Sequence, residues 1–446
     1  MGFGGRRPRF TAAFLLFAAA SDPGGTEAYD PLEGIEEDGR IPYVERPADL
    51  PNPSRWRYIP EGRIKRGTVF DRLFITSFIA PFVFKSSDAG WGGGIGVGDI
   101  DFRSQNRRET AAIFGSFSEN RQQNYGFAWR RWIHHIDLPD GGVLQEERSV
   151  MRARASYSKT RTRRFFGFGA DAREEAESSY TDDFVLIDLG LSHTLFEPGS
   201  DLIGILGTRA ELHRLSSGIV GGVPNTGDAF STTFSRDEKR NMGWLGAGLR
   251  FDTRDSQSNP YRGWFVGALV DAALAQTGGD VGAVITVDGS RVFPVPGLLH
   301  RAIDFRGEEN PPTDTLLVGL RTQFTAGDLP FYSLPTLGGS RAGMHGFIAG
   351  RFRDRASWYG TAEYRFWVLP RGFGFEQPYR IERIGLGVFY EAGSVADTWP
   401  NLFSASVQHS YGASLVFSIE RTWPFRVNLA FSRDGFQFTF GSGLSF

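Results

Sequence analysis

Seven histidines offer the widest range of chemistry in this chain, because an imidazole can bind a metal or move a proton. They are His134, His135, His193, His213, His300, His345 and His409. None has a spacing to Ser and Asp typical of a hydrolase, and the chain contains no Gly-x-Ser-x-Gly turn. The neighbours His134 and His135 would point to opposite faces of a strand, which disfavours a shared metal. We therefore expect no enzymatic activity, no catalytic residue, no metal and no cofactor.

Two other segments contain residues suited to binding phosphate. The run GGGIGVG, residues 92–98, is not followed by the Lys-Ser/Thr pair and helix of a phosphate loop, so we predict a closely packed strand instead. The segment 161–179 places Arg161, Arg163 and Arg164 before several phenylalanines. It either contacts lipopolysaccharide phosphates or is a solvated loop above an aromatic girdle.

The elements that position these residues are strands. From about Ile75 onward, runs of roughly 8 to 16 residues alternate in polarity between clusters of turn formers, as strands tilted through a bilayer do. The last eleven residues show this pattern, with Phe436, Phe438 and Phe440 separated by polar or small residues and Phe446 at the end. We predict an all-β fold, a transmembrane antiparallel barrel of about sixteen strands. The expected strands are 77–86, 90–103, 107–117, 122–136, 148–160, 180–196, 201–216, 242–254, 262–276, 281–294, 314–328, 357–369, 381–393, 409–421, 424–433 and 435–446.

Charged residues on these strands are expected to face the lumen. A charge at the bilayer midplane on the lipid side costs about 2–4 kcal/mol, so the opposite face is favoured. This rule turns Glu363 and Arg365 inward on one strand, Arg383 and Glu391 on another, and Arg426 on a third. The lumen is therefore expected to hold opposite charges that can pair.

Composition supports this fold class. The 446 residues include 57 Gly and 40 Phe, yet the mean hydropathy is only -0.27, which excludes a protein built of apolar membrane helices. The chain has no cysteine, and a net charge of -2 gives no reason to expect a nucleic-acid partner.

The first 74 residues differ from the rest. A short apolar run, Phe10–Ala20, follows three arginines and predicts a signal peptide over residues 1–20. Residues 21–74 are rich in proline and contain an acidic cluster, so we expect a flexible periplasmic lead-in. The barrel is assigned to residues 75–446.

Four stretches together resemble the outer-membrane protein assembly family, the bacterial surface antigen barrels of the BamA/TamA type. They are LRFDTRDSQSNPYRG (249–263), LGGSRAGMHGFIAGRFRDR (337–355), the strand pair TAEYRFWV and LGVFYEAGSVAD, and the ending 411–446. Their order and spacing carry the resemblance, which covers about residues 80–446.

The resemblance implies a long loop between strands 11 and 12 that folds into the lumen. Its signature residues would be Gly338, Gly339, His345, Gly346, Phe347, Arg351 and Arg353. His345 stands where the family has an arginine, and the acidic partners implied on the wall are Glu363 and Glu391. Histidine has fewer donors than arginine and an unperturbed pKa of about 6.5, so a weaker or pH-sensitive anchor is expected. A histidine without special role, or replacement by a nearby arginine, remains an alternative.

The resemblance also implies a periplasmic turn motif and a terminal signal. The turn residues are Asp252, Arg254, Asp255, Pro260 and Gly263, and the C-terminal signal is Phe446.

By this resemblance the protein is expected in the bacterial outer membrane, where it inserts or exports proteins through strand pairing at a lateral seam. Outer-membrane lipids, client proteins and a separate periplasmic partner are the expected partners, because the short lead-in leaves no room for the periplasmic repeat domains of the family. The alternative is a passive channel or structural barrel that kept the fold without insertase activity.

Overall fold

Sixteen strands follow one another in an antiparallel meander, each paired with the next one along the chain. The computed structural model describes residues 12–15, 36, 40, 42–59, 77–86, 90–139, 141–234, 237–299, 307–308, 311–339, 343–370, 373–374, 380–419 and 423–442. The strands are β3 (Ser77–Ser86), β4 (Gly90–Asp99), β5 (Glu109–Ser118), β6 (Gln123–Trp132), β9 (Val150–Phe165), β10 (Ser178–Thr194), β11 (Leu202–Ser217), β12 (Lys239–Asp252), β13 (Gly263–Gln276), β14 (Gly282–Val295), β15 (Asp314–Gly327), β18 (Ala356–Leu369), β20 (Arg380–Ala396), β21 (Gln408–Ile419), β22 (Trp423–Ser432) and β23 (Gly435–Ser442). All sixteen predicted strands are confirmed, with small differences at their ends.

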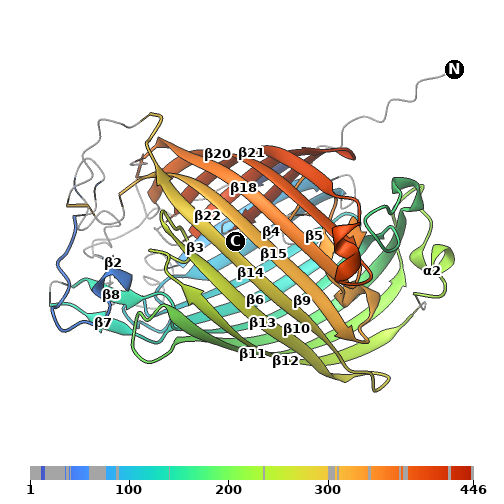
Figure 1. Ribbon diagram of the computed structural model, residues 1–446, viewed down its shortest axis with the longest axis horizontal. Helices are drawn as coiled ribbons and strands as arrows, with labels where there is room; N and C mark the ends of the chain where they lie inside the picture. Colours follow the sequence, from blue (N-terminus) through green and yellow to red (C-terminus); the bar gives the residue numbers. More distant parts are fainter. Residues whose placement is uncertain are drawn as a thin grey trace.

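The meander curls into a barrel, so that a near wall and a far wall face each other across a lumen (Figure 1). We call the end that carries β2 (Trp56–Ile59), β7 (His135–Asp137) and β8 (Val143–Glu146) the base, on the left of the figure. The opposite end, with the short helix α2 (Thr226–Ala229), is the rim. Among the described residues no helix combines the length and apolar character needed to cross a membrane.

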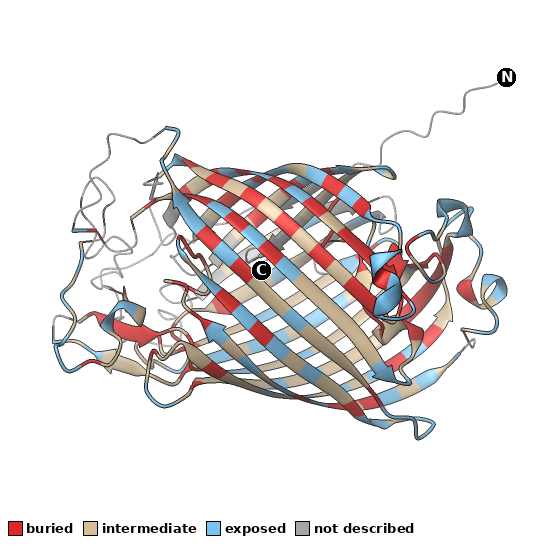
Figure 2. Ribbon diagram, in the orientation of Figure 1, coloured by how far each residue is buried: buried red, intermediate tan, exposed pale blue. Residues whose placement is uncertain are grey.

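Burial alternates along the strands, as Figure 2 shows by its red and pale blue bands. On β20, Arg383 and Glu391 are buried inside the barrel, whereas Leu386, Val388 and Tyr390 are exposed on its outer face. This alternation follows from the pleat, which sends successive side chains to opposite faces. The inward orientation predicted for the charged residues is confirmed on β18 and β22 as well, since Glu363, Arg365 and Arg426 are buried.

The β9–β10 hairpin is longer than expected. Arg163 and Arg164, which we assigned to a loop, pair with residues 179–180 of β10, and the side chains of Arg164, Phe165 and Phe166 are buried. Phe165 packs in a cluster with Tyr180, Leu215, Phe234 and Phe331. Neither a lipopolysaccharide contact nor an aromatic girdle therefore describes these side chains.

A three-stranded sheet at the base, in the order β2, β8, β7, was not predicted. Trp56 and Tyr58 of β2 pack with Leu50 and Leu144, so part of the predicted lead-in is ordered against the linker between β6 and β9. Strand β1 (Ala12–Leu15), within the predicted signal peptide, pairs with β3. The remaining short elements are η1 (Pro53–Arg55), η2 (Glu174–Ala176), η3 (Phe331–Ser333), β16 (Thr336–Leu337), β17 (Phe352–Arg353), β19 (Phe373–Gly374) and η4 (Pro400–Phe403).

Candidate functional site

The connection between β15 and β18, the eleventh and twelfth barrel strands, folds inward as predicted. Its residues Leu337, Met344, Phe347 and Phe352 are almost fully buried and cluster with Tyr359 on the inner wall. Phe347 and Phe352 meet edge to face, with 5.1 Å between ring centroids. The loop thus carries a small apolar core of its own, which fixes its shape inside the barrel.

Glu391 of β20 holds the tip of this loop. Its Oε2 accepts a hydrogen bond from the backbone N–H of His345 at 2.7 Å, and its Oε1 lies 2.6 Å from His345 Nδ1. The hydroxyls of Tyr359 and Ser410 donate to the same carboxylate at 2.6 and 2.5 Å. Glu391 and His345 are 1% and 6% exposed, so four contacts converge on one carboxylate shielded from water. Such an arrangement is costly to disrupt, because each buried donor would lose its acceptor.

Gly346 allows the tip to approach the wall closely. A Cβ at this position would lie 2.6 Å from the backbone oxygen of Phe431 and 2.8 Å from Ser410 Cβ. Ser432 Oγ also donates to the Gly346 carbonyl at 2.6 Å. The predicted Gly338 and Gly339 lie further back in the loop with φ of +109° and +87°, a region that favours glycine.

Arg351 forms a second attachment of the loop. Its Nε donates to Asp434 Oδ2 at 2.5 Å and its Nη1 to the Ala172 carbonyl at 2.8 Å. The guanidinium also lies 4.6 Å from the ring centroids of Phe166 and Phe352. Asp434 sits in the tight β22–β23 turn, and no sequence signal marked it as a partner.

The two predicted acidic partners have different roles. Glu391 contacts His345, whereas Glu363 lies 2.8 Å from Arg426 and 3.4 Å from Arg365. Glu363 thus pairs with arginines of the wall, and a contact between Glu363 and the loop tip stays a prediction. Strands β18 and β20 alternate inward charges, and spacing alone does not show which charge lies opposite the tip.

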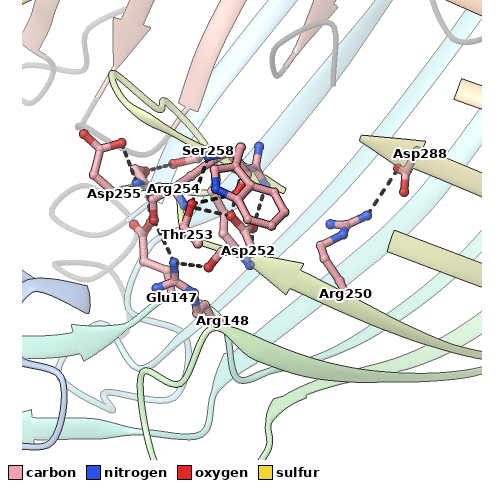
Figure 3. A network of polar contacts seen from close by, with 12 residues as sticks. Glu147, Arg148, Arg250, Asp252, Thr253, Arg254, Asp255, Ser258 and Asp288 are labelled. Atoms are coloured by element: carbon pink, nitrogen blue, oxygen red, sulfur yellow. Dashed lines mark hydrogen bonds and ion pairs between the residues drawn. The ribbon is translucent and has the colours of Figure 1, made fainter. Parts of the chain in front are cut away.

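The predicted turn motif lies at the base between β12 and β13 (Figure 3). Arg254 folds back onto Asp252, with Nε–Oδ1 and Nη2–Oδ2 distances of 2.9 and 2.7 Å. Asp255 Oδ1 accepts backbone hydrogen bonds from Ser256, Tyr261 and Arg262, while burial raises the pKa of this carboxyl. The motif therefore shapes a compact turn from its own side chains.

Gly263 and Pro260 complete this turn. Gly263 has φ +101°, and a Cβ there would lie 2.6 Å from both Arg254 Cα and the Thr253 oxygen. Pro260 is buried in the same turn. The glycine thus lets β13 begin directly against the Asp252–Arg254 segment.

Two arginines that the sequence analysis missed tie this turn to other segments. Arg55 Nη1 donates to the carbonyls of Thr253 and Arg254 at 3.0 and 2.8 Å. Arg148 Nη2 donates to those of Asp252 and Arg254 at 3.1 and 2.7 Å. Arg55 belongs to the predicted lead-in and Arg148 to the start of the predicted strand 148–160, and no motif distinguishes either arginine from its neighbours. The predicted signal residue Phe446 lies outside the described residues.

The fold and this site define a class of protein: an outer-membrane β-barrel with an inward loop pinned to the inner wall of its C-terminal strands. A family model described as the Omp85 superfamily domain matches residues 62–446. The chain belongs to the Omp85 superfamily, which confirms the expected family and the outer-membrane location. No curated protein matches the sequence.

Several solved structures resemble this fold. BamA from Haemophilus ducreyi lacking POTRA domains 1–3 has a TM-score of 0.48 and 14% identity over 82% of this chain and 70% of that one. CdiB from Escherichia coli has a TM-score of 0.48 and 11% sequence identity, and the match covers 82% of this chain and 61% of that one. CdiB from Acinetobacter baumannii has a TM-score of 0.45 and 10% sequence identity, and the match covers 83% of this chain and 59% of that one. The chain thus spans less than two thirds of both CdiB chains.

Proposed function

We propose that this protein helps to insert or export proteins at the outer membrane by pairing a client strand with the edge of its barrel sheet. Client outer-membrane or secreted proteins, and a separate periplasmic partner that delivers them, are the proposed partners. The process needs no covalent chemistry and no cofactor, since the backbone hydrogen bonds of an added strand supply the affinity.

The observation that carries this proposal is the edge of β3. On the side of β3 turned away from β4, where the sheet order also places β23, residues 82–85 pair with an extended segment of the same chain, β1, in the register Ala12 to Lys85 through Leu15 to Phe82. This edge can therefore accept an antiparallel strand from outside the barrel meander. If the predicted signal peptide is removed on export, β3 loses this partner along these residues, and a client strand can take its place.

The loop supports the same proposal from the other end of the meander. Its tip is bonded to Glu391 of β20 and to Ser432 of β22, and Ser410 of β21 donates to the same Glu391 carboxylate, close to the last strand β23. A loop fastened there stiffens the wall beside the terminal strand, which leaves the terminal edges themselves as the places where pairing can change.

The experiment that tests this function is quantitative proteomics of the outer membrane after depletion of the protein. We expect a selective fall in other barrel proteins or in one exported client, with lipid and lipopolysaccharide unchanged. An unchanged set of membrane proteins would contradict the proposal and favour the alternative, a passive channel or structural barrel.

A pair of variants at Val83 tests whether the change in membrane proteins depends on the edge of β3. Replacing Val83 with proline removes one backbone donor from this strand, whereas Val83→Thr keeps the backbone intact. We expect the proline variant alone to lose complementation although it still reaches the membrane. Full complementation by both variants would show that pairing at this edge is not required.

A further inference from the structure

A cavity of about 220 Å³ lies between the inward loop and the wall formed by β10, β11 and β12. The loop contributes Tyr332, Ser333 and Arg353, and the wall contributes His213 and Trp244. The cavity is distinct from the His345–Glu391 anchor, which contacts β18, β20 and β21. A volume of this size holds a small polar molecule or several waters.

Three polar groups that line the cavity have no hydrogen-bond partner among the residues that the structure describes. They are the Nε and Nη1 of Arg353, the Nε2 of His213 and the hydroxyl of Tyr332. Arg353 and His213 are only 7% and 8% exposed. Burying polar groups without partners is unfavourable, so the cavity is suited to a ligand that satisfies them.

The orientation of His213 defines what this ligand must offer. Its Nδ1 lies 3.0 Å from Asp182 Oδ1, and its ring stacks on Phe184 with 4.4 Å between centroids. A carboxylate accepts hydrogen bonds, and a carboxylate lies beside each ring nitrogen, which favours the ring with a proton on both Nδ1 and Nε2. The Nε2 lies 3.8 Å from Glu211 Oε2, beyond hydrogen-bonding distance. A ligand acceptor is therefore required at Nε2.

Charge in the cavity favours an anion. Glu211 pairs with Arg209 at 2.9 Å and accepts from Trp244 at 2.8 Å, and Asp182 lies 3.9 Å from Arg163. Arg353 has no carboxylate within ion-pair distance in the described part of the chain; it lies 5.5 Å from the ring centroid of Phe331. The unpaired guanidinium offers two N–H donors to an oxyanion.

We propose that this cavity binds the phosphate group of a small ligand. Its oxygens accept hydrogen bonds from Arg353, from the Tyr332 hydroxyl and from His213 Nε2. A phosphate group carries a charge of about −1.5 to −2 near pH 7 and three strong acceptor oxygens, which matches this set of donors. The bound group joins the loop to β11, opposite the anchor at Glu391.

The test is titration calorimetry on the folded full-length barrel in detergent, with inorganic phosphate, glycerol 3-phosphate and glycerol as ligands. We expect saturable binding of phosphate or its ester near pH 7 and at least about tenfold weaker binding of glycerol, which has no charged oxygens. Tighter binding of inorganic phosphate identifies a free ion as the ligand, and tighter binding of glycerol 3-phosphate identifies an esterified group.

Three variants distinguish binding at this cavity from a general effect of positive charge in the lumen. Arg353→Gln is expected to weaken phosphate binding about tenfold or more, which corresponds to about 1.4 kcal/mol, because it removes the positive charge and the charged donors. Tyr332→Phe removes one hydroxyl and serves as the conservative variant if Arg353→Gln does not fold. Arg152→Gln removes the same charge from a lumen residue paired with Asp188, outside the cavity, and should bind like the parent.

Absence of saturable phosphate binding, or equal affinity for glycerol and glycerol 3-phosphate, would overturn the proposal. Equal losses in Tyr332→Phe and Arg152→Gln would do so as well, because they would show a diffuse charge effect. Depletion proteomics is independent of this outcome, so failure of the phosphate site leaves the proposed assembly function to its own test.

Discussion

At the scale of single residues, one carboxylate organises the loop. The Glu391 carboxylate accepts hydrogen bonds from the His345 backbone N–H and from the hydroxyls of Tyr359 and Ser410. Its Oε1 also lies 2.6 Å from His345 Nδ1. These contacts come from the loop and from two wall strands besides its own. Removing the carboxylate therefore affects several segments at once, while a change at His345 affects only one contact.

We predict that Glu391→Ala releases the loop without unfolding the barrel. The change leaves buried donors without an acceptor, at about 1–3 kcal/mol for each. Limited proteolysis in detergent should show faster cleavage within 343–350, with the heat-modifiable migration of the barrel retained. Asp397→Ala, which removes an exposed carboxylate bonded to Asn401 at the rim, is the control and should leave the cleavage rate unchanged. Equal protection in both variants would contradict the anchor.

His345→Arg should make loop attachment stronger and less dependent on pH. Arginine keeps its charge over the accessible range and offers five donors, whereas an imidazole offers at most two. The measurement is the cleavage rate of the loop between pH 5.5 and 8.5 in both proteins. We expect a flat profile for the variant and a changing one for the parent; identical profiles would refute the idea that the histidine makes the anchor pH-sensitive.

At the scale of elements, the base sheet contains a second informative histidine. His135 of β7 is nearly buried, with its Nδ1 3.3 Å from Gln145 Nε2 of β8. Desolvation by burial is the largest cause that lowers the pKa of His135 to about 4. The neutral ring is thus preferred in the folded sheet.

This lowered pKa predicts acid sensitivity of the base sheet. The stabilisation is present above the unfolded pKa of about 6.5 and is lost as the pH falls from there toward 4, because protonation then favours the unfolded segment. At pH 5 the loss is on the order of 1–2 kcal/mol. Hydrogen exchange at residues 143–146, corrected for intrinsic rates, should quicken between pH 7 and pH 5.

The neutral variant His135→Gln is the matched control for that measurement. It should remove most of the pH dependence of exchange within the sheet while retaining a polar group near Gln145. An unchanged pH dependence would assign the acid sensitivity to other groups.

Alternation of polarity made the barrel strands predictable. It did not predict the short strands or the side-chain contacts between segments far apart in the sequence. The inward orientation of Glu391 and its place opposite the loop tip could be predicted, because the pleat and the family motif indicate the same residue. The sheet of β2, β8 and β7 could not, since strands of three or four residues carry too little periodicity. Arg55, Arg148 and Asp434 were missed because their contacts join segments far apart in sequence.

At the scale of the whole molecule, the inward loop fills part of the lumen. Met344 and Phe347 are 0% and 1% exposed, so the tip is packed against the wall and does not hang free. The passage through the barrel is therefore narrower than that of a sixteen-stranded barrel without such a loop.

Deletion of residues 343–350 should widen that passage. In planar bilayers we expect a higher single-channel conductance for the deletion than for the parent, with Asp397→Ala behaving like the parent. A large conductance in the parent itself, unchanged by the deletion, would show that the loop does not limit the passage and would favour the channel alternative.

The contacts around the loop tip also determine the stage of folding at which the loop can dock. Tyr359, Glu391, Ser410 and Ser432 belong to four consecutive strands, and a slip of one residue in any of them would turn its contact toward lipid. The tip can dock only after all four have reached their native register. A docked loop is therefore expected only in a barrel whose four strands are correctly paired, so protection of the loop from a protease would report the register of all four at once.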